Sequence, residues 1–158
     1  MSNPLAIPPT DSRTLRAVTL NLWGDNGPYE RRLELCVEEL RALSPDVVAL
    51  QEVRYVPNKV QNTAETLAIA LGLQSIYQKT VEWGGGDEGL ALLSRYPVRE
   101  SGHVLLPHPM PEDQRILLWA LLDSGAGTVL AGTTHLTYRM THGDKRADQA
   151  AAVDETVQ

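Results

Sequence analysis

Two polar side chains stand at the ends of apolar segments of this sequence, and both could take part in chemistry. Asn21 interrupts the segment LRAVTLNLW, and Glu52 closes the nearly continuous apolar run of DVVALQEV. Asn is a poor strand residue, and Glu rarely ends an apolar run by chance. In a sheet of parallel strands, ligands bind beyond the carboxyl ends of the strands. We therefore expect Asn21 and Glu52 to converge at one sheet edge; the alternative is that both simply face water.

The segments that carry these two residues resemble a strand–helix–strand unit. Strands are expected over residues 15–23 and 46–53, with a helix over residues 29–43 between them. The crossover of such a unit is almost always right-handed. The helix prediction rests on apolar residues at helical spacing: Leu33, Cys36, Val37, Leu40 and Leu43.

The remainder of the chain alternates short apolar segments with turn signals. A second helix is expected over residues 59–71, ending at Gly72, and a last one over residues 145–157. The strands expected between these two helices cover residues 73–81, 89–94, 98–106, 115–123 and 128–135. An α/β start followed by a run of strands indicates an α+β or mixed-sheet sandwich.

Composition limits the class of protein. With 158 residues, 42% hydrophobic and 22% charged, the chain fits one globular domain. The net charge of −6 argues against a protein that contacts many phosphates through Lys and Arg, but not against a small metal-bridged phosphate site. No signal peptide and no apolar span are recognisable, so a cytoplasmic location is expected.

Five segments in a fixed order carry a family resemblance. They are VTLNLWG with Asn21, DVVALQEV with Glu52, EGLALLSRYPV over residues 88–98, Gln114-Arg115, and Thr134-His135-Leu136. This series resembles the endonuclease/exonuclease/phosphatase family of metal-dependent phosphoester hydrolases. The resemblance implies an α+β fold that is part of a four-layer α/β/β/α, DNase I-like sandwich, with this chain holding mostly the first of two mixed sheets.

The resemblance also implies roles for the matched residues. Glu52 would be a ligand of a catalytic Mg²⁺, or Mn²⁺, and Asn21 would hold a phosphate oxygen or orient Glu52. His135 would face the scissile phosphate as a general acid or electrostatic stabiliser. Glu88 would be the acidic partner of His135, raising its pKa above the usual value of about 6.5. Arg115 would contact the phosphate of the substrate.

Elementary electrostatics agrees with a metal at Glu52. A carboxylate about 4 Å from a phosphodiester anion is repelled by about 4 kcal/mol at an effective dielectric constant near 20. Glu52 can therefore face a phosphate productively only through a cation, and Mg²⁺ prefers hard oxygen ligands.

Other candidate residues keep simpler explanations. His103, His108 and His142 match no position of the family pattern and are expected to be ordinary surface residues. No Cys/His spacing indicates zinc. The segment Trp83-Gly84-Gly85-Gly86 lacks the Lys-Ser/Thr of a P-loop and is expected to connect two strands.

Three downstream segments of the family are absent from the sequence: Gly-Asp-x-Asn, a later aspartate and Ser-Asp-His. We therefore expect residues 1–14 to be a flexible tail and residues 15–158 to be the N-terminal part of a domain truncated before its C-terminal half. This chain alone would be inactive and would either self-associate through an uncovered sheet face or be partly unfolded. The alternative is a non-catalytic fragment or interaction module. The substrate stays open among nucleic acids, phospholipid headgroups and small phosphoesters.

Overall fold

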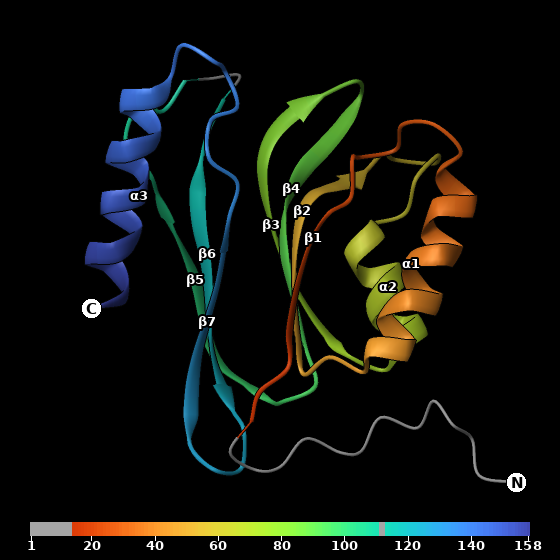
Figure 1. Ribbon diagram of the computed structural model, residues 1–158. Coiled ribbons are helices and arrows are strands. Elements are labelled where there is room, and N and C mark those ends of the chain that lie inside the picture. The colour runs from red at the N-terminus through yellow and green to blue at the C-terminus, as the bar shows by residue number, and fades with distance from the viewer. Residues whose placement is uncertain (1–13, 111–112) are drawn as a thin grey trace, which may run out of the picture.

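Two β-sheets lie face to face between outer helices in the computed structural model, which describes residues 14–110 and 113–158 (Figure 1). Helices α1 and α2 cover the outer face of the first sheet, and α3 lies along the outer side of the second. This four-layer arrangement confirms the predicted fold class. Of the tail expected over residues 1–14, all but Thr14 lies outside the described residues.

The first sheet contains the predicted parallel pair. Strand β1 (Ala17–Asn21) pairs in parallel with β2 (Val47–Tyr55), and helix α1 (Tyr29–Leu43) crosses between them. The helix ends at Leu43, and its C-cap residue Ser44 takes a left-handed conformation with φ +47° directly before Pro45. The strand order of this sheet is β1-β2-β4-β3.

Helix α2 (Thr63–Leu71) begins four residues later than expected. The Asn62 side chain accepts hydrogen bonds from the backbone N–H groups of Ala64 and Glu65, so it caps the helix at that point. The preceding residues, expected to be helical, instead form a tight turn in which Val56 and Val60 pair as an isolated bridge. A polar cap residue therefore decided the boundary more strongly than the apolar pattern did.

The next two strands form a hairpin. Strands β3 (Gln74–Trp83) and β4 (Gly86–Ser94) are antiparallel, with Trp83 opposite Gly86. The two residues between them, Gly84 and Gly85, have φ +56° and +74°. Positive φ at both positions is what the tightest hairpin turns require, and glycine adopts it without steric cost. The glycine-rich segment is therefore a strand connection, as predicted.

The second sheet corrects the expectation that this chain holds mostly one sheet. It contains β5 (Val98–Leu105), β6 (Ile116–Asp123) and β7 (Thr128–Thr134) in the antiparallel order β5-β6-β7, followed by α3 (Gly143–Val157). The chain thus contributes four strands to one sheet and three to the other.

Alternation along the strands fills two separate cores. On β2, Val48 and Leu50 face the helices, whereas Val47 faces the second sheet. On β4, Leu93 faces the helices and Leu92 the second sheet. This double burial explains the continuous apolar runs of both strands. The two sheets cover the inner faces of β2, β4 and β6, whereas Ala17 and Thr19 on the inner side of β1 stay exposed, so the uncovered face is much smaller than expected.

Candidate active site at the end of the first sheet

Asn21, at the carboxyl end of β1, meets Glu52 of the neighbouring strand β2. Asn21 Nδ2 donates a hydrogen bond of 2.9 Å to Glu52 Oε1, and Asn21 Oδ1 accepts one of 2.8 Å from the backbone N–H of Trp23. The parallel register places Asn21 opposite Gln51, so the two side chains meet because the strands end on the same edge. Asn21 is held from both sides and in turn orients Glu52.

The apolar pattern suggested that Glu52 ends its strand, but β2 continues beyond it to Tyr55. The residue lies inside β2 with φ +53°, where the pairing with β4 shifts register between Leu50 and Val53. This is a β-bulge, and bulges re-aim side chains next to functional sites. A positive φ is uncommon in a residue other than glycine and costs free energy. Such strain clusters at functional sites, so the backbone of Glu52 indicates that the direction of its side chain matters for function.

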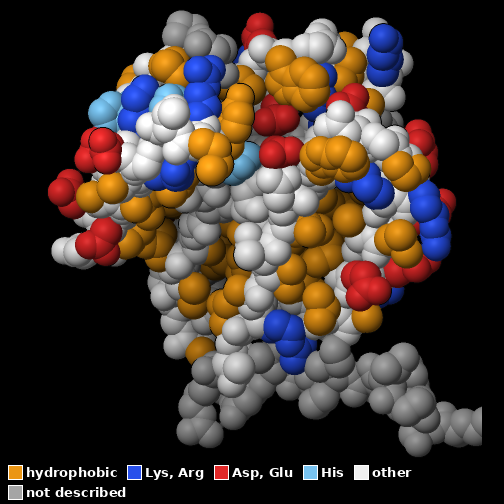
Figure 2. Space-filling model, turned by 45° about the horizontal axis from the view of Figure 1, so that its top comes forward, with side chains coloured by type: hydrophobic (Ala, Val, Ile, Leu, Met, Phe, Trp, Pro, Cys, Tyr) orange, Lys and Arg blue, Asp and Glu red, His pale blue; other side chains and the backbone are white. Residues whose placement is uncertain are grey.

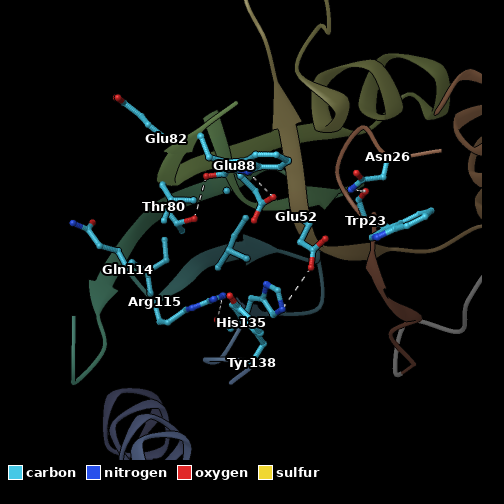
Figure 3. A pocket seen from close by; sticks show the side chains of 15 residues that line it. Trp23, Asn26, Glu52, Thr80, Glu82, Glu88, Gln114, Arg115, His135 and Tyr138 are labelled. Atoms are coloured by element: carbon cyan, nitrogen blue, oxygen red, sulfur yellow. Dashed lines mark hydrogen bonds and ion pairs between the residues drawn. The ribbon is translucent and has the colours of Figure 1, made fainter. Parts of the chain in front are cut away.

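His135 follows β7 and reaches Glu52 across the gap between the two sheets. Its Nε2 lies 3.9 Å from Glu52 Oε1, and the two side chains are turned toward each other (Figure 3). The neighbouring Gln51 reinforces the approach of the sheets, because its Nε2 donates to Thr133 Oγ1 at 2.9 Å. The histidine and the carboxylate therefore come from different sheets and are joined only by tertiary packing.

The predicted pairing of His135 with Glu88 is wrong in its partner and in its direction. The structure places Glu52 beside the imidazole, while Glu88 Oε2 accepts a 3.1 Å hydrogen bond from Trp83 Nε1. Burial, reinforced by the positive charge of Arg115, lowers the pKa of His135 below its ordinary value, against the smaller opposing effect of Glu52.

Glu88 stands on β4, opposite Arg54 of β2 in the sheet register. Burial is the main cause of its raised pKa; the negative charge of Glu52 acts in the same direction, whereas the hydrogen bond from Trp83 lowers it. Two carboxylates thus face one cavity, and their mutual repulsion makes that cavity favourable for a cation.

Arg115 opens onto the same cavity in a fixed orientation. Its Nε donates to the carboxylate of Asp113, which is 4% exposed, and Asp113 also accepts from Thr137 Oγ1 at 3.0 Å. Its second contact runs from Nη1 to the backbone carbonyl of His135 at 3.1 Å. Asp113 therefore positions Arg115. The sequence pattern did not single out Asp113, although its place two residues before the arginine could have indicated an ion pair between them.

These side chains surround one cavity of about 450 Å³ between the two sheets. Glu52, Glu88, Arg115 and His135 line it (Figure 3), whereas Asn21 is not among the lining residues and contacts the cavity only through its hydrogen bond to Glu52. Figure 2 shows acidic side chains beside a histidine in a hollow that apolar side chains flank. Sequence reasoning missed the aromatic residues of this wall, which are Trp23, Trp83 and Tyr138.

The donors at this edge fit a divalent cation with hard-ligand preference. Glu52 offers a carboxylate whose side chain is 24% exposed, so water and substrate oxygens can reach a cation bound there. Mg²⁺ is usually held by one or two carboxylates and keeps several waters. No group of three or more His, Cys, Asp or Glu side chains suited to a metal occurs among the described residues.

Comparison with known proteins agrees with this architecture. The family model described as "Endonuclease/Exonuclease/phosphatase family" matches residues 18–156. The chain therefore belongs to the endonuclease/exonuclease/phosphatase family. Comparison with curated proteins finds no match.

Several solved structures share the fold at low sequence identity. A family protein from Leptotrichia buccalis is 12% identical with a TM-score of 0.76; the match covers 92% of this chain and 64% of that one. An endonuclease/exonuclease/phosphatase from Beutenbergia cavernae is 23% identical with a TM-score of 0.73, and the match covers 91% of this chain and 44% of that one. A humanized D. rerio TDP2 is 20% identical with a TM-score of 0.72, and the match covers 90% of this chain and 56% of that one. This chain thus spans less than two thirds of the length of these structures. None of its described helices is long and apolar enough to cross a membrane.

Proposed function

We propose that this chain carries the metal-binding and phosphate-binding part of a Mg²⁺-dependent, or Mn²⁺-dependent, phosphoester hydrolase. The observation that carries the proposal is the convergence on one oxygen, Glu52 Oε1, of Asn21 at 2.9 Å and His135 at 3.9 Å. These residues come from three separate strands or strand ends, and the backbone of Glu52 is strained to reach the site.

Glu52 would hold the metal ion, with Asn21 keeping its carboxylate turned toward the cavity. A bound Mg²⁺ would polarise a phosphoryl oxygen and offset the charge that develops during hydrolysis. Arg115, held by Asp113, would bind a phosphate oxygen through its guanidinium, which presents several N–H donors to an oxyanion. The repulsion between Glu52 and the phosphate is then compensated by two positive groups.

His135 would contact the phosphate from the second sheet, beside Glu52. Because burial and Arg115 lower its pKa, the imidazole is neutral near pH 7 and offers one N–H donor. That donor would stabilise the developing negative charge or hydrogen-bond the leaving oxygen. Glu88 would act on the same cavity through Trp83, whose indole N–H it accepts.

The 158-residue chain alone would bind metal and phosphate but would not hydrolyse the ester. None of the Gly-Asp-x-Asn and Ser-Asp-His segments expected to position water and supply a general base occurs in its sequence. The second candidate function is a non-catalytic interaction module that keeps the fold and the cavity without these segments. The whole protein that contains this chain would be the hydrolase.

A metal-binding titration tests the proposal directly. Mn²⁺ binding to the 158-residue chain, followed by electron paramagnetic resonance or calorimetry, should be lost in Glu52→Gln. The matched control is Glu100→Gln, which removes the same charge from an exposed position on β5 and should bind as the wild type does. In the whole protein, hydrolysis of bis(p-nitrophenyl) phosphate should stop with chelator and return with Mg²⁺. Full activity in excess chelator, or unchanged Mn²⁺ binding by Glu52→Gln, would reject the assignment.

A further inference from the structure

The aromatic residues of the cavity share an unusual feature. Among the described residues, three cation–π contacts occur, and each involves an aromatic side chain that lines this cavity. The pairs are Arg32 with Trp23 at 5.3 Å, Arg54 with Trp83 at 4.1 Å, and Arg115 with Tyr138 at 5.8 Å, measured from the guanidinium carbon to the ring centroid. The three rings nevertheless stay 57%, 44% and 71% exposed, respectively. Clustered exposed aromatic surface marks a binding site more often than it marks a core.

Trp83 is the most firmly held of the three rings. The side chain of Arg54 beneath it is only 2% exposed and is paired with Asp25 at 3.1 Å. Its remaining N–H groups donate to the carbonyls of Gly84 at 3.3 Å and Asp87 at 3.2 Å, on either side of the hairpin turn. The buried Arg54 thus ties the hairpin turn to β2 and holds the ring that the hairpin carries.

The edge of the Trp83 ring is fixed as well. Its Nε1 donates to Glu88 Oε2, so the indole cannot rotate freely about its side-chain bonds. Because Arg54 covers one face, the exposed part of the ring is its other face and its edges. An aromatic surface that is already ordered loses little conformational entropy when a ligand stacks on it.

Trp23 is fixed on the metal side of the cavity. Its backbone, with φ +56°, donates to Asn21 Oδ1, and its ring lies against Gly27, where an added Cβ would come within 3.2 Å. Arg32, which contacts the ring, is anchored to the carbonyls of Leu22 and Gly24. Figure 3 shows Trp23 and Tyr138 beside Glu52 and His135. The aromatic wall and the candidate active site are therefore one structure.

Size and charge limit what this wall can bind. A cavity of about 450 Å³ holds one small ligand of roughly nucleotide size. Glu52, Glu82 and Glu88 line it against Arg115, and the whole chain carries a net charge of −6. A ligand with several phosphates would be repelled by the three carboxylates, because Arg115 offsets only one of their charges. A single phosphoester bridged to Glu52 by a metal ion would avoid this repulsion.

We propose that this cavity selects phosphoesters that carry a planar aromatic ring close to the phosphate, with the ring stacked on Trp83. The inference rests on the proposed function and narrows its substrate class. A nucleobase and a phenyl group share this chemistry, since each offers a flat π-face to an indole. Phosphoesters of sugars and glycerol lack such a ring and would use only the phosphate contacts.

Binding of three ligands to the 158-residue chain in Mg²⁺ tests the proposal: thymidine 5′-monophosphate, phenyl phosphate and glycerol 1-phosphate. Calorimetry should show the third ligand binding most weakly. Trp83→Leu should weaken the two aromatic ligands by about 5- to 150-fold, the range of one lost stacking contact, and change glycerol 1-phosphate by less than about twofold. Trp83→Phe should restore most of the loss. If Trp83→Leu weakens the binding of one aromatic ligand more than that of the other, that ligand carries the preferred ring, either the nucleobase or the phenyl group.

The controls separate stacking from a structural role and from the proposed function. Trp119→Phe changes a tryptophan of the second sheet that packs on Gly102 and should leave all three affinities unchanged. Equal binding of the three ligands by the wild type, or an equal loss for all three in Trp83→Leu, would overturn the stacking proposal. Glu52→Gln should weaken all three ligands alike. If it changes none of them while Trp83→Leu still discriminates, the metal assignment fails and the aromatic subsite stands.

Discussion

Glu52 shows how a single residue combines strain with a candidate function. Its left-handed backbone is imposed by the bulge in β2, and its carboxylate is the point where Asn21 and His135 meet. An L-residue other than Gly, Asn or Asp in this conformation costs roughly 1–2 kcal/mol. Strain of this kind persists where the surrounding structure requires it, and here the requirement is the direction of one side chain.

The strain predicts an inverted order of stabilities at this position. Glu52→Gly should be more stable than Glu52→Ala by about 1 kcal/mol, because only glycine adopts a positive φ without steric cost. Both variants lack the carboxylate, so the difference reports the backbone alone. Chemical denaturation of the two proteins measures it.

Ala49 of the same strand supplies the comparison. It has no positive φ, so Ala49→Gly should show the usual order and lower stability by about 0.5–1 kcal/mol. If Glu52→Ala is the more stable of the two variants at position 52, the strained conformation is not a property of the folded protein in solution.

At the scale of elements, the β3–β4 hairpin carries much of the cavity wall. Glycine is required at Gly89, where an added Cβ would lie 2.2 Å from the Gln78 carbonyl and 2.8 Å from the Tyr77 ring. The Tyr77 ring lies against Gly89 of β4, and its hydroxyl is buried without a hydrogen-bond partner among the described residues. The hairpin thus contains one polar group that its own packing leaves unsatisfied.

Tyr77 predicts a pH dependence of stability. Burial, together with the charges of Asp87 and Glu88, raises the pKa of its hydroxyl from 10.0 to about 12. Because the folded-state pKa is the higher one, the neutral hydroxyl contributes stability that is fully present below pH 10 and is lost as the pH rises from 10 to about 12. Tyr77→Phe should flatten the loss in this window and raise stability at pH 7 by about 1 kcal/mol, since it removes an unsatisfied buried group.

Thermal melts between pH 7 and pH 12 measure both effects. Tyr138→Phe is the control at pH 7: its ring is 71% exposed, so removing its hydroxyl should leave the unfolding temperature unchanged. A lower stability of Tyr77→Phe at pH 7 would mean that the hydroxyl has a partner, such as an ordered water, in the folded protein.

For the whole molecule, the open strand edges matter more than the sheet faces. The inner faces are covered except beside β1, and within the described residues β1 pairs only with β2, and β7 only with β6. Residues of both strands line one groove of about 350 Å³. Side-by-side edges with free backbone N–H and C=O groups are templates for pairing with another strand.

We therefore predict that the purified 158-residue chain self-associates through the β1 and β7 edges. Leu130 on β7 is 45% exposed, and Leu130→Lys should shift the protein toward the monomer because a charged edge residue disfavours strand pairing. Ile69→Lys on α2 is the control, because Ile69 is 84% exposed but lies on no strand edge. Sedimentation velocity over a concentration series would decide, and a wild-type monomer at every concentration would contradict the prediction.

Local patterns in the sequence determined the order of the elements and the first half of the site. Apolar spacing placed α1, and an apolar run closed by Glu52 marked β2, so Asn21 and Glu52 could be expected to meet because parallel strands end together. Only the tertiary structure decided the partners. The bulge at Glu52 and the approach of His135 from the other sheet depend on contacts between strands far apart in sequence. The buried Arg54 beneath Trp83 joins residues 29 positions apart, and no local periodicity encodes a contact of that range.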